Sequence, residues 1–282
     1  MKKTINRLWI ILKDLENKKM INVDVNACEF GYELCMVLPY VYHHFEQKNK
    51  INLRTCSNMK PFYYFLPENS VEYHYEKRRS TLPIGTKIRS LHEKNPDRTE
   101  WLCPSYKTVY EKYSLNIEFK KPLLLISNKY TDEWGQEPVN YLSPDCLDKL
   151  FESFSQNYDI IYNRVKSKNI IGDDQNNLDL NESSLLKKYE NVYDMNEILE
   201  KEDYDFNTLQ LIILSKAENK ISVQGGTSIL SSLTGGNNLV YAVKGGELSC
   251  DAYTSWYKDF SGCSVKNFSS YDSLIQSAEE LF

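Results

Sequence analysis

The sequence lacks the long apolar runs that membrane anchors need. In a chain of 282 residues, the longest apolar run near the start is Leu8–Leu12. This is far short of the roughly 20 residues that cross a bilayer. No small-residue cleavage site follows it. We therefore expect neither a transmembrane segment nor a secretory signal.

A strong charge of one sign is also absent. Lysine and arginine number 34, and aspartate and glutamate 39, so the formal net charge is −5. The two signs are mixed along the chain, which gives no general attraction for nucleic acid or for anionic membranes. No nucleic-acid partner is expected, and an anionic ligand has to be met by a local site.

Disulfide, zinc and serine-hydrolase patterns are missing. The seven cysteines form an odd set without C-x-x-C spacing, which favours reduced thiols and a cytoplasmic location. Peripheral attachment to a membrane is a further option. The four histidines show neither H-x-x-x-H nor H-E-x-x-H spacing, so no zinc site is expected. The G-x-S-x-G turn is absent.

The distribution of proline and glycine changes along the chain. All nine prolines lie within residues 39–144, whereas six of the eleven glycines lie within residues 225–246. Chains of this length often form two domains. We predict an N-terminal domain over residues 1–118 and a C-terminal domain over residues 119–282.

The first half opens with a strand, a turn, a helix and a second strand. Residues 21–25 alternate as a strand, residues 32–47 have apolar side chains at helical spacing with a kink expected at Pro39, and residues 51–56 form the next strand. This βαβ unit predicts a parallel sheet. Residues 61–113 are aromatic without a clear period, and both a functional loop and an unrecognised part of the sheet remain open.

The second half alternates strands and helices more regularly. Strands are predicted at residues 123–126, 159–162, 191–194, 220–223 and 238–243. Helices are predicted at residues 143–156, 205–217, 229–233 and 269–282, with a loop at residues 172–184. Successive βα units predict a doubly wound sheet, in which ligands bind at the carboxyl ends of the strands.

A glycine-rich turn follows the fourth of these strands. In Gln224-Gly-Gly-Thr-Ser228, Gly225 and Gly226 allow close approach of the backbone to a ligand. Thr227 and Ser228 place hydroxyl and N–H groups at a helix start, which suits phosphate oxygens. The spacing matches neither the P-loop nor the dinucleotide fingerprint. A tight turn with a serine cap is the alternative.

This turn, the strand at residues 238–243 and the pair Gly245–Gly246 resemble the nucleotide-sugar domain of GT-B glycosyltransferases over residues 121–282. The resemblance implies an α/β fold with two Rossmann-like domains that face a cleft. It implies that the glycine turn holds the donor diphosphate and that the last helix returns to the first domain. A nucleotide-sugar donor, an oligosaccharide or glycan acceptor, and no cofactor or metal are expected.

In this fold the turn after the first strand faces the cleft and often supplies the catalytic base. Glu29 is the first candidate because it precedes Gly31 in the turn. Asp24, inside the strand, is the second. A solvated glutamate is the plainer interpretation of Glu29. Glu33 falls in the first helical turn, where a carboxylate favours the helix dipole.

A diphosphate that leaves without a metal needs basic partners. Arg164, at a strand end, is the first candidate because a guanidinium group can contact phosphate through two donors. Lys129 is the second candidate and Lys244 the third. Asp194 ends its strand and can either bond to the base or ribose or cap a helix.

Two charged motifs have plainer explanations. Asp203-Tyr-Asp205 spells the D-x-D signature of manganese-dependent GT-A glycosyltransferases. It follows no apolar strand and precedes a helical pattern, so helix capping is expected and a metal is not. The adjacent pair Arg78 and Arg79 can reach the phosphates across from the first domain, but a solvated surface position is the plainer expectation.

The sequence thus predicts a metal-independent glycosyltransferase. If Glu29 deprotonates the acceptor, a single displacement inverts the anomeric centre. Two alternatives stay open. One is another nucleotide-sugar enzyme, such as a 2-epimerase or a pyruvyl-transferase-like enzyme. The other is a carbohydrate- or nucleotide-binding protein without a functioning base.

Overall fold

Two parallel sheets form the framework of the molecule. The computed structural model describes residues 18–87, 93–132, 135–165 and 176–282. One sheet has three strands in the order β1-β2-β3, and the other has six in the order β6-β5-β4-β7-β8-β9. The run Leu8–Leu12 and residues 172–175 of the predicted loop lie outside the described residues.

Neighbouring strands are parallel in both sheets. The first sheet contains β1 (Met20–Asp24), β2 (Lys50–Cys56) and β3 (Val71–Tyr75). The second contains β4 (Leu123–Asn128), β5 (Asp159–Arg164), β6 (Val192–Asp194), β7 (Asn219–Val223), β8 (Asn237–Tyr241) and β9 (Ser264–Phe268). The predicted strands and the parallel first sheet are confirmed, while β3 and β9 were not predicted as strands.

The helices connect these strands. They are α2 (Phe30–Tyr32), α3 (Leu38–Glu46), α4 (Tyr106–Tyr110), α5 (Pro144–Phe154), α6 (Ser183–Leu186), α7 (Met195–Leu199), α8 (Phe206–Lys216), α9 (Gly226–Ser232), α10 (Gly246–Ser249), α11 (Ala252–Ser255) and α12 (Tyr271–Leu281). Single turns of other helix types are the π turn η1 (Glu33–Val37) and the 3₁₀ turns η2 (Glu68–Ser70) and η3 (Tyr257–Phe260).

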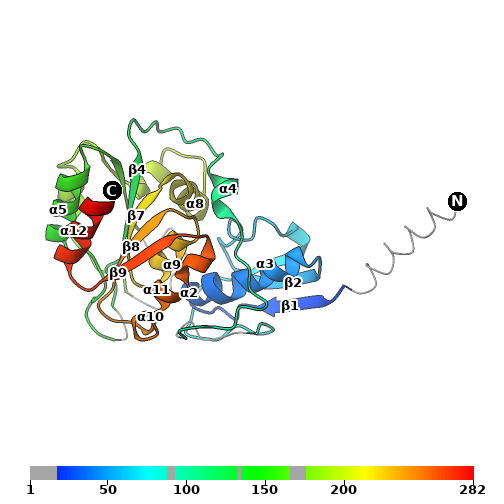
Figure 1. Ribbon diagram of the computed structural model, residues 1–282. Coiled ribbons are helices and arrows are strands. Elements are labelled where there is room, and N and C mark those ends of the chain that lie inside the picture. Colours follow the sequence, from blue (N-terminus) through cyan, green and yellow to red (C-terminus); the bar gives the residue numbers. More distant parts are fainter. Residues whose placement is uncertain (1–17, 88–92, 133–134, 166–175) are drawn as a thin grey trace.

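The six-stranded sheet has the strand order of doubly wound nucleotide-binding sheets. Counted along the chain, its strands lie in the order 3-2-1-4-5-6, with the reversal between β4 and β7. Helices α5 and α12 cover one face, and α8 and α9 cover the other (Figure 1). The predicted α/β class is confirmed. The three strands of the first sheet do not by themselves establish a second doubly wound domain.

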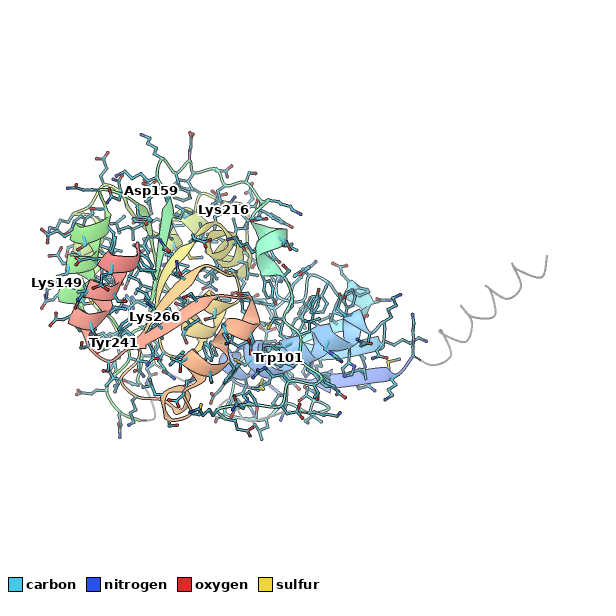
Figure 2. All side chains as sticks on the ribbon, viewed as in Figure 1. Trp101, Lys149, Asp159, Lys216, Tyr241 and Lys266 are labelled. Carbon is cyan, nitrogen blue, oxygen red and sulfur yellow. The ribbon has the colours of Figure 1, made fainter. Side chains whose placement is uncertain are left out.

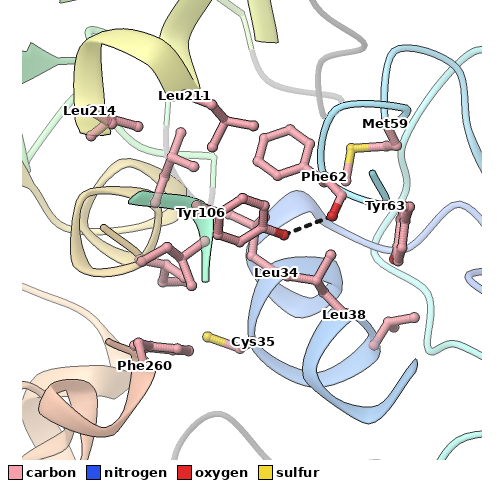
Figure 3. Close-up of a cluster of buried hydrophobic side chains, with 14 of the residues drawn as sticks. Leu34, Cys35, Leu38, Met59, Phe62, Tyr63, Tyr106, Leu211, Leu214 and Phe260 are labelled. Carbon is pink, nitrogen blue, oxygen red and sulfur yellow. Dashed lines mark hydrogen bonds between the residues drawn. The ribbon is translucent and has the colours of Figure 1, made fainter. Parts of the chain in front are cut away.

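Alternating residues of β4 supply two hydrophobic cores. Leu124 and Ile126 belong to the core beneath α5 and α12, whereas Leu123 and Leu125 belong to a core that continues into the first half. Figure 3 shows part of this shared core, where residues from both halves pack around a hydrogen bond from the Tyr106 hydroxyl to a backbone carbonyl. Because this core extends across residues 118 and 119, the domain boundary stays a prediction.

The last helix packs on its own sheet. Helix α12 contacts α5, β8 and β9, and its Leu274 and Ala278 are fully buried. The resemblance to GT-B enzymes implied that this helix returns to the first domain. Here the six-stranded sheet covers its apolar face instead.

Pro39 leaves one helix carbonyl without its usual N–H donor, and Trp101 supplies a donor instead. Proline cannot donate to the carbonyl four residues before it, which here belongs to Cys35. The Trp101 indole N–H donates to that carbonyl over 2.7 Å. The ring packs against Trp256 and Phe260, so Trp101 lies at the junction between the halves (Figure 2). At the predicted kink, the helical segment contains the π turn η1 directly before α3.

Gly236, just before β8, lies in close contact with the backbone of Glu218. Its φ is +70°, and a Cβ would lie 2.1 Å from the Glu218 carbonyl oxygen. We expect Gly236→Ala to lower the free energy of unfolding by more than about 2 kcal/mol. At Gly262, φ is +77° and a Cβ would meet nothing within 4 Å, so Gly262→Ala should cost about 1 kcal/mol. Equal losses in urea denaturation would contradict this account.

Lys220 places a charge inside the six-stranded sheet. Its side chain is fully buried, and Nζ donates to the Gly235 carbonyl over 2.6 Å. Burial lowers the pKa of Lys220 from 10.5 to about 8. The unfolded chain therefore binds more protons between these two values, and the stability contributed at this position rises with pH across that window.

Comparison with Lys220→Met isolates this effect, because other titrating groups are common to both proteins. We expect the stability of the wild type relative to the variant to rise between pH 8 and pH 10.5. The rise should be at most about 3 kcal/mol. Urea denaturation of both proteins at several pH values measures the difference, and a difference independent of pH would refute the assignment.

Candidate functional site

The reversal of strand order brings two strand-end loops together. Strands β4 and β7 are neighbours at this reversal and run parallel. The loops that begin at Lys129 and at Gln224 therefore both leave the sheet at the carboxyl ends of its strands. Strand β7 ends at Val223 and α9 begins at Gly226, with Gly225 between them at φ +108°. A residue with a Cβ is strained at this φ. The glycine turn therefore connects β7 to α9, as the sequence predicts.

The two hydroxyl groups of the glycine turn face the protein. Thr227 Oγ1 donates to the Val223 carbonyl over 2.6 Å, and Ser228 Oγ donates to the Gly225 carbonyl over 2.8 Å. Asn238 on β8 donates to the Ser228 carbonyl over 3.0 Å and so holds the start of α9. The first N–H groups of a helix have no intrahelical acceptor. Both hydroxyl protons are thus used within the protein, and the Ser228 N–H donates to the Gly225 carbonyl over 3.1 Å.

Gln224 connects the loops that follow three strands. Its side-chain N–H donates to Glu247 Oε2 over 2.8 Å, and its Oε1 accepts from Asn140 over 3.1 Å and from Lys129 Nζ over 3.5 Å. Glu247 is 5% exposed. Glu247 is not among the residues predicted from the sequence, although its place directly after Gly245–Gly246, at the start of a helix, points to this edge of the sheet.

Lys129 is the predicted basic residue that the fold brings to the glycine turn. A Cβ on Gly225 would lie 3.2 Å from Lys129 Nζ. Lys244 also lies beyond the carboxyl end of a strand, in this case β8, but its Nζ donates to Gln136 Oε1 over 3.0 Å. Its exposed side chain therefore lies along the neighbouring loop.

Arg164, the first-ranked basic candidate, lies farther from the turn. It ends β5, which β4 separates from β7, a spacing of about 10 Å in a sheet. Its Nε pairs with Glu182 Oε1 at 2.5 Å, and its Nη1 donates to the Leu178 carbonyl over 3.1 Å. These contacts direct Arg164 toward residues 178–182.

Asp194 caps helix α7. Its Oδ1 accepts from the backbone N–H of Asn196 over 2.8 Å and from the side-chain N–H of the same residue over 2.7 Å. Of the two roles predicted for Asp194, these bonds support the cap. Asp205 accepts from the Thr208 N–H over 3.0 Å at the start of α8. Within the described ranges, no cluster of three or more potential metal ligands occurs.

The turn after β1 has a strained backbone. Asn26 and Ala27 have φ of +50° and +56°, a region that costs residues other than glycine roughly 1–3 kcal/mol each. The Asn26 N–H donates to Asp24 Oδ1 over 2.7 Å. Such strain concentrates at functional sites. This turn, residues 25–28, directly precedes Glu29 and is called the β1 turn below.

The two carboxylates predicted at this turn have different surroundings. Asp24 ends β1 and accepts from the Tyr75 hydroxyl over 2.6 Å, with Arg54 Nη1 at 3.6 Å. These contacts tie Asp24 to β2 and β3. Glu29 is half-buried and precedes α2. Burial raises the pKa of Tyr32, and the negative charges of Glu29 and Glu247 raise it further. The charges of two glutamates, one from each half, thus act on the same tyrosine.

The β1 turn and the glycine turn lead into helices that touch. A Cβ on Gly226 would lie 3.1 Å from Phe30 Cδ1, and a Cβ on Gly31 would lie 3.3 Å from Ile229 Cδ1. Helix α2 lies beside α9 (Figure 1). The missing side chain of Gly226 thus makes room for an aromatic ring of the protein. The predicted role of Gly226 in the approach of a ligand stays a prediction.

A hollow of about 350 Å³ lies at the opposite end of α9. It is lined by residues 103–108, 233–235, 260 and 261, together with Glu111. Its volume lies at the lower end of the range for ligand pockets. The lining does not include residues 224–228, so the hollow and the glycine turn are separate places.

Comparisons with known proteins add one remote likeness. No family model and no curated protein matches the chain. The fold is similar to that of the wall teichoic acid polymerase TagF, with 12% identity and a TM-score of 0.35, over 86% of this chain and 51% of that chain. The chain thus spans about half the length of that protein. A likeness this remote carries no argument about function.

The described part of the chain contains no helix with both the length and the apolar character that a bilayer crossing requires.

Two substitutions test the cap at Asp194. Asp194→Ala removes the acceptor and should lower the free energy of unfolding by about 1 kcal/mol, whereas Asp194→Asn keeps a capping side chain and should cost little. Neither should alter affinity for a nucleoside diphosphate. Urea denaturation and calorimetric titration measure the two quantities. Normal stability with lost affinity in either variant would show that Asp194 binds the ligand.

Proposed function

We propose that this chain is a glycosyltransferase with a nucleotide-diphosphate sugar as donor and a hydroxyl group of a glycan as acceptor. It requires no metal ion and inverts the anomeric centre. One observation carries the proposal: helix α2, which follows Glu29, touches helix α9, which begins in the glycine turn beside Lys129.

The donor diphosphate binds to the glycine turn. The amides of Gly226 and Thr227 and the ammonium group of Lys129 supply positive charge where the leaving group gains negative charge. Sheets with this strand order bind nucleotides at the reversal point, which supports the choice. Lys129 takes the role first given to Arg164, because its Nζ lies beside Gly225.

Glu29 acts as the general base. Its carboxylate takes the proton of the acceptor hydroxyl while the hydroxyl oxygen attacks the anomeric carbon. The bond from that carbon to the diphosphate oxygen breaks in the same step, so the configuration inverts. The half-burial of Glu29 and the strain in the turn before it support this role.

A second candidate is a carbohydrate- or nucleotide-binding protein without turnover. The contact between Phe30 and Gly226 favours it, because the aromatic ring covers part of the turn that the donor uses in the first proposal.

A substitution at Glu29 distinguishes the two candidates. A thermal-shift screen with UDP-, GDP-, CMP- and dTDP-sugars identifies the donor, because a ligand of the native state raises its apparent stability. Glu29→Gln should keep donor affinity and lower turnover by about 100- to 10,000-fold.

Glu152→Gln changes an exposed carboxylate on α5 and should alter neither quantity. Full turnover in Glu29→Gln would remove Glu29 from the mechanism. Donor binding without turnover in the wild type, measured with a range of glycan acceptors, would favour the second candidate.

Lys129 provides a test of the donor site. Lys129→Met should raise the donor Kd by about 10- to 100-fold, the loss expected for a hydrogen bond to a charged group. Lys149→Met removes an exposed charge on α5 (Figure 2) and should leave the Kd unchanged. Calorimetric titration measures both constants. Equal Kd values for the two variants would exclude Lys129 from the donor site.

A further inference from the structure

A buried ion pair lies beneath the β1 turn. Arg78 Nη1 is 2.7 Å from Glu33 Oε2, and the side chains are 2% and 0% exposed. The hydroxyls of Thr55 and Tyr63 donate to Glu33 Oε1, the latter over 3.0 Å. The surface position expected for Arg78 is therefore wrong, and Arg79 alone of the two arginines is exposed. The interpretation of Glu33 as a residue that only favours the helix dipole is corrected as well.

Stability alone does not explain this pair. Burial by itself lowers the pKa of Arg78, but the Glu33 carboxylate, together with nearby Cys56 and Cys28, holds the pKa above its ordinary value. The guanidinium group thus keeps its charge inside the protein. Removing two charges from water offsets most of their attraction, so a buried ion pair adds little net stability.

Residues 78–81 form a strap along the β1 turn. Each of three successive carbonyl groups in the turn accepts a hydrogen bond from this strap. The donors and acceptors are Thr81 Oγ1 to Asn26, the Arg79 N–H to Ala27 over 2.6 Å, and Arg78 Nη1 to Cys28 over 2.9 Å. These three hydrogen bonds therefore fix the strained backbone of the β1 turn directly before Glu29.

Arg78 contacts the chain on both sides of Glu29. Before Glu29, it donates to the Cys28 carbonyl. After Glu29, its guanidinium carbon lies 5.1 Å from the centre of the Phe30 ring, and Nη1 pairs with Glu33. Glu29 is thus held between contacts that a single side chain supplies.

We propose that Arg78 is a positioning residue that holds Glu29 opposite the glycine turn. The inference rests on the proposed function, in which Glu29 is the base. Phe30 links the two places, because its ring contacts both the guanidinium group and Gly226. Loss of Arg78 displaces the base and leaves Lys129 in place. A displacement of about 1 Å at a reacting group lowers turnover by about 100-fold.

The choice of variants follows from the buried pair. Arg78→Met alone leaves the Glu33 carboxylate buried without its charge partner, which endangers folding. The main variant therefore combines Arg78→Met with Glu33→Gln, which removes both charges together. Arg78→Lys is the conservative variant, because an ammonium group has enough donors to replace Nη1 at both the Cys28 carbonyl and the Glu33 carboxylate.

Kinetics on the full chain, with the donor identified by thermal shift, test the role. The double variant should lower kcat by about 10- to 100-fold and change the donor Kd by less than about threefold. Arg78→Lys should recover most of the lost turnover. Adding Glu29→Gln to the double variant should cause no loss beyond that of Glu29→Gln alone, because both changes remove one function. Unchanged kcat, or losses that multiply, would overturn the proposal.

Hydrogen exchange separates this inference from the proposed function. The double variant should speed exchange at the amides of residues 28–31 and leave residues 221–223 of β7 unchanged. If the wild type transfers no sugar and exchange still speeds up, the positioning role stands and the proposed function fails. Unchanged exchange at residues 28–31 would overturn the positioning role, whatever activity the chain has.

Discussion

The contact between the Phe30 ring and Gly226 joins the two halves of the molecule at the candidate site. A Cβ on Gly226 would lie 3.1 Å from this ring, so a larger residue at this position requires the ring to shift. The close approach sets the β1 turn against the edge of the sheet where β4 and β7 end. The place of Glu29 relative to the glycine turn depends on this contact, whereas Lys129 lies beside Gly225 because β4 and β7 are neighbours in one sheet.

The sequence predicts the regular βα units because their apolar patterns are unambiguous. Residues 123–126 and 160–162 are buried on both faces, as strands of parallel sheets usually are, and they read as continuous apolar runs. Strand β9 (Ser264–Phe268) lies at the sheet edge with side chains that are half-buried or exposed, so its sequence lacks such a run. Strand β3 (Val71–Tyr75) is mostly exposed and was missed for the same reason.

Local chemistry also predicts the glycine turn, because φ at Gly225 demands a residue without a side chain. Contacts between distant segments are not predictable in this way. Arg78 is adjacent to an exposed arginine, and nothing near it in the sequence indicates that it forms a buried ion pair with Glu33. Glu247 reaches Gln224 because β8 lies beside β7, a fact that only the strand order supplies. The inward hydroxyls of the turn depend on backbone acceptors that the motif does not reveal.

The central claim is that the amides of Gly226 and Thr227 hold a diphosphate group. Titrating the isotope-labelled chain with a nucleoside diphosphate, and following the backbone amides by NMR, tests this claim most directly. The account predicts the largest changes in chemical shift at residues 225–227 and at Lys129. Changes concentrated instead at residues 103–108, beside the hollow at the other end of α9, would contradict it.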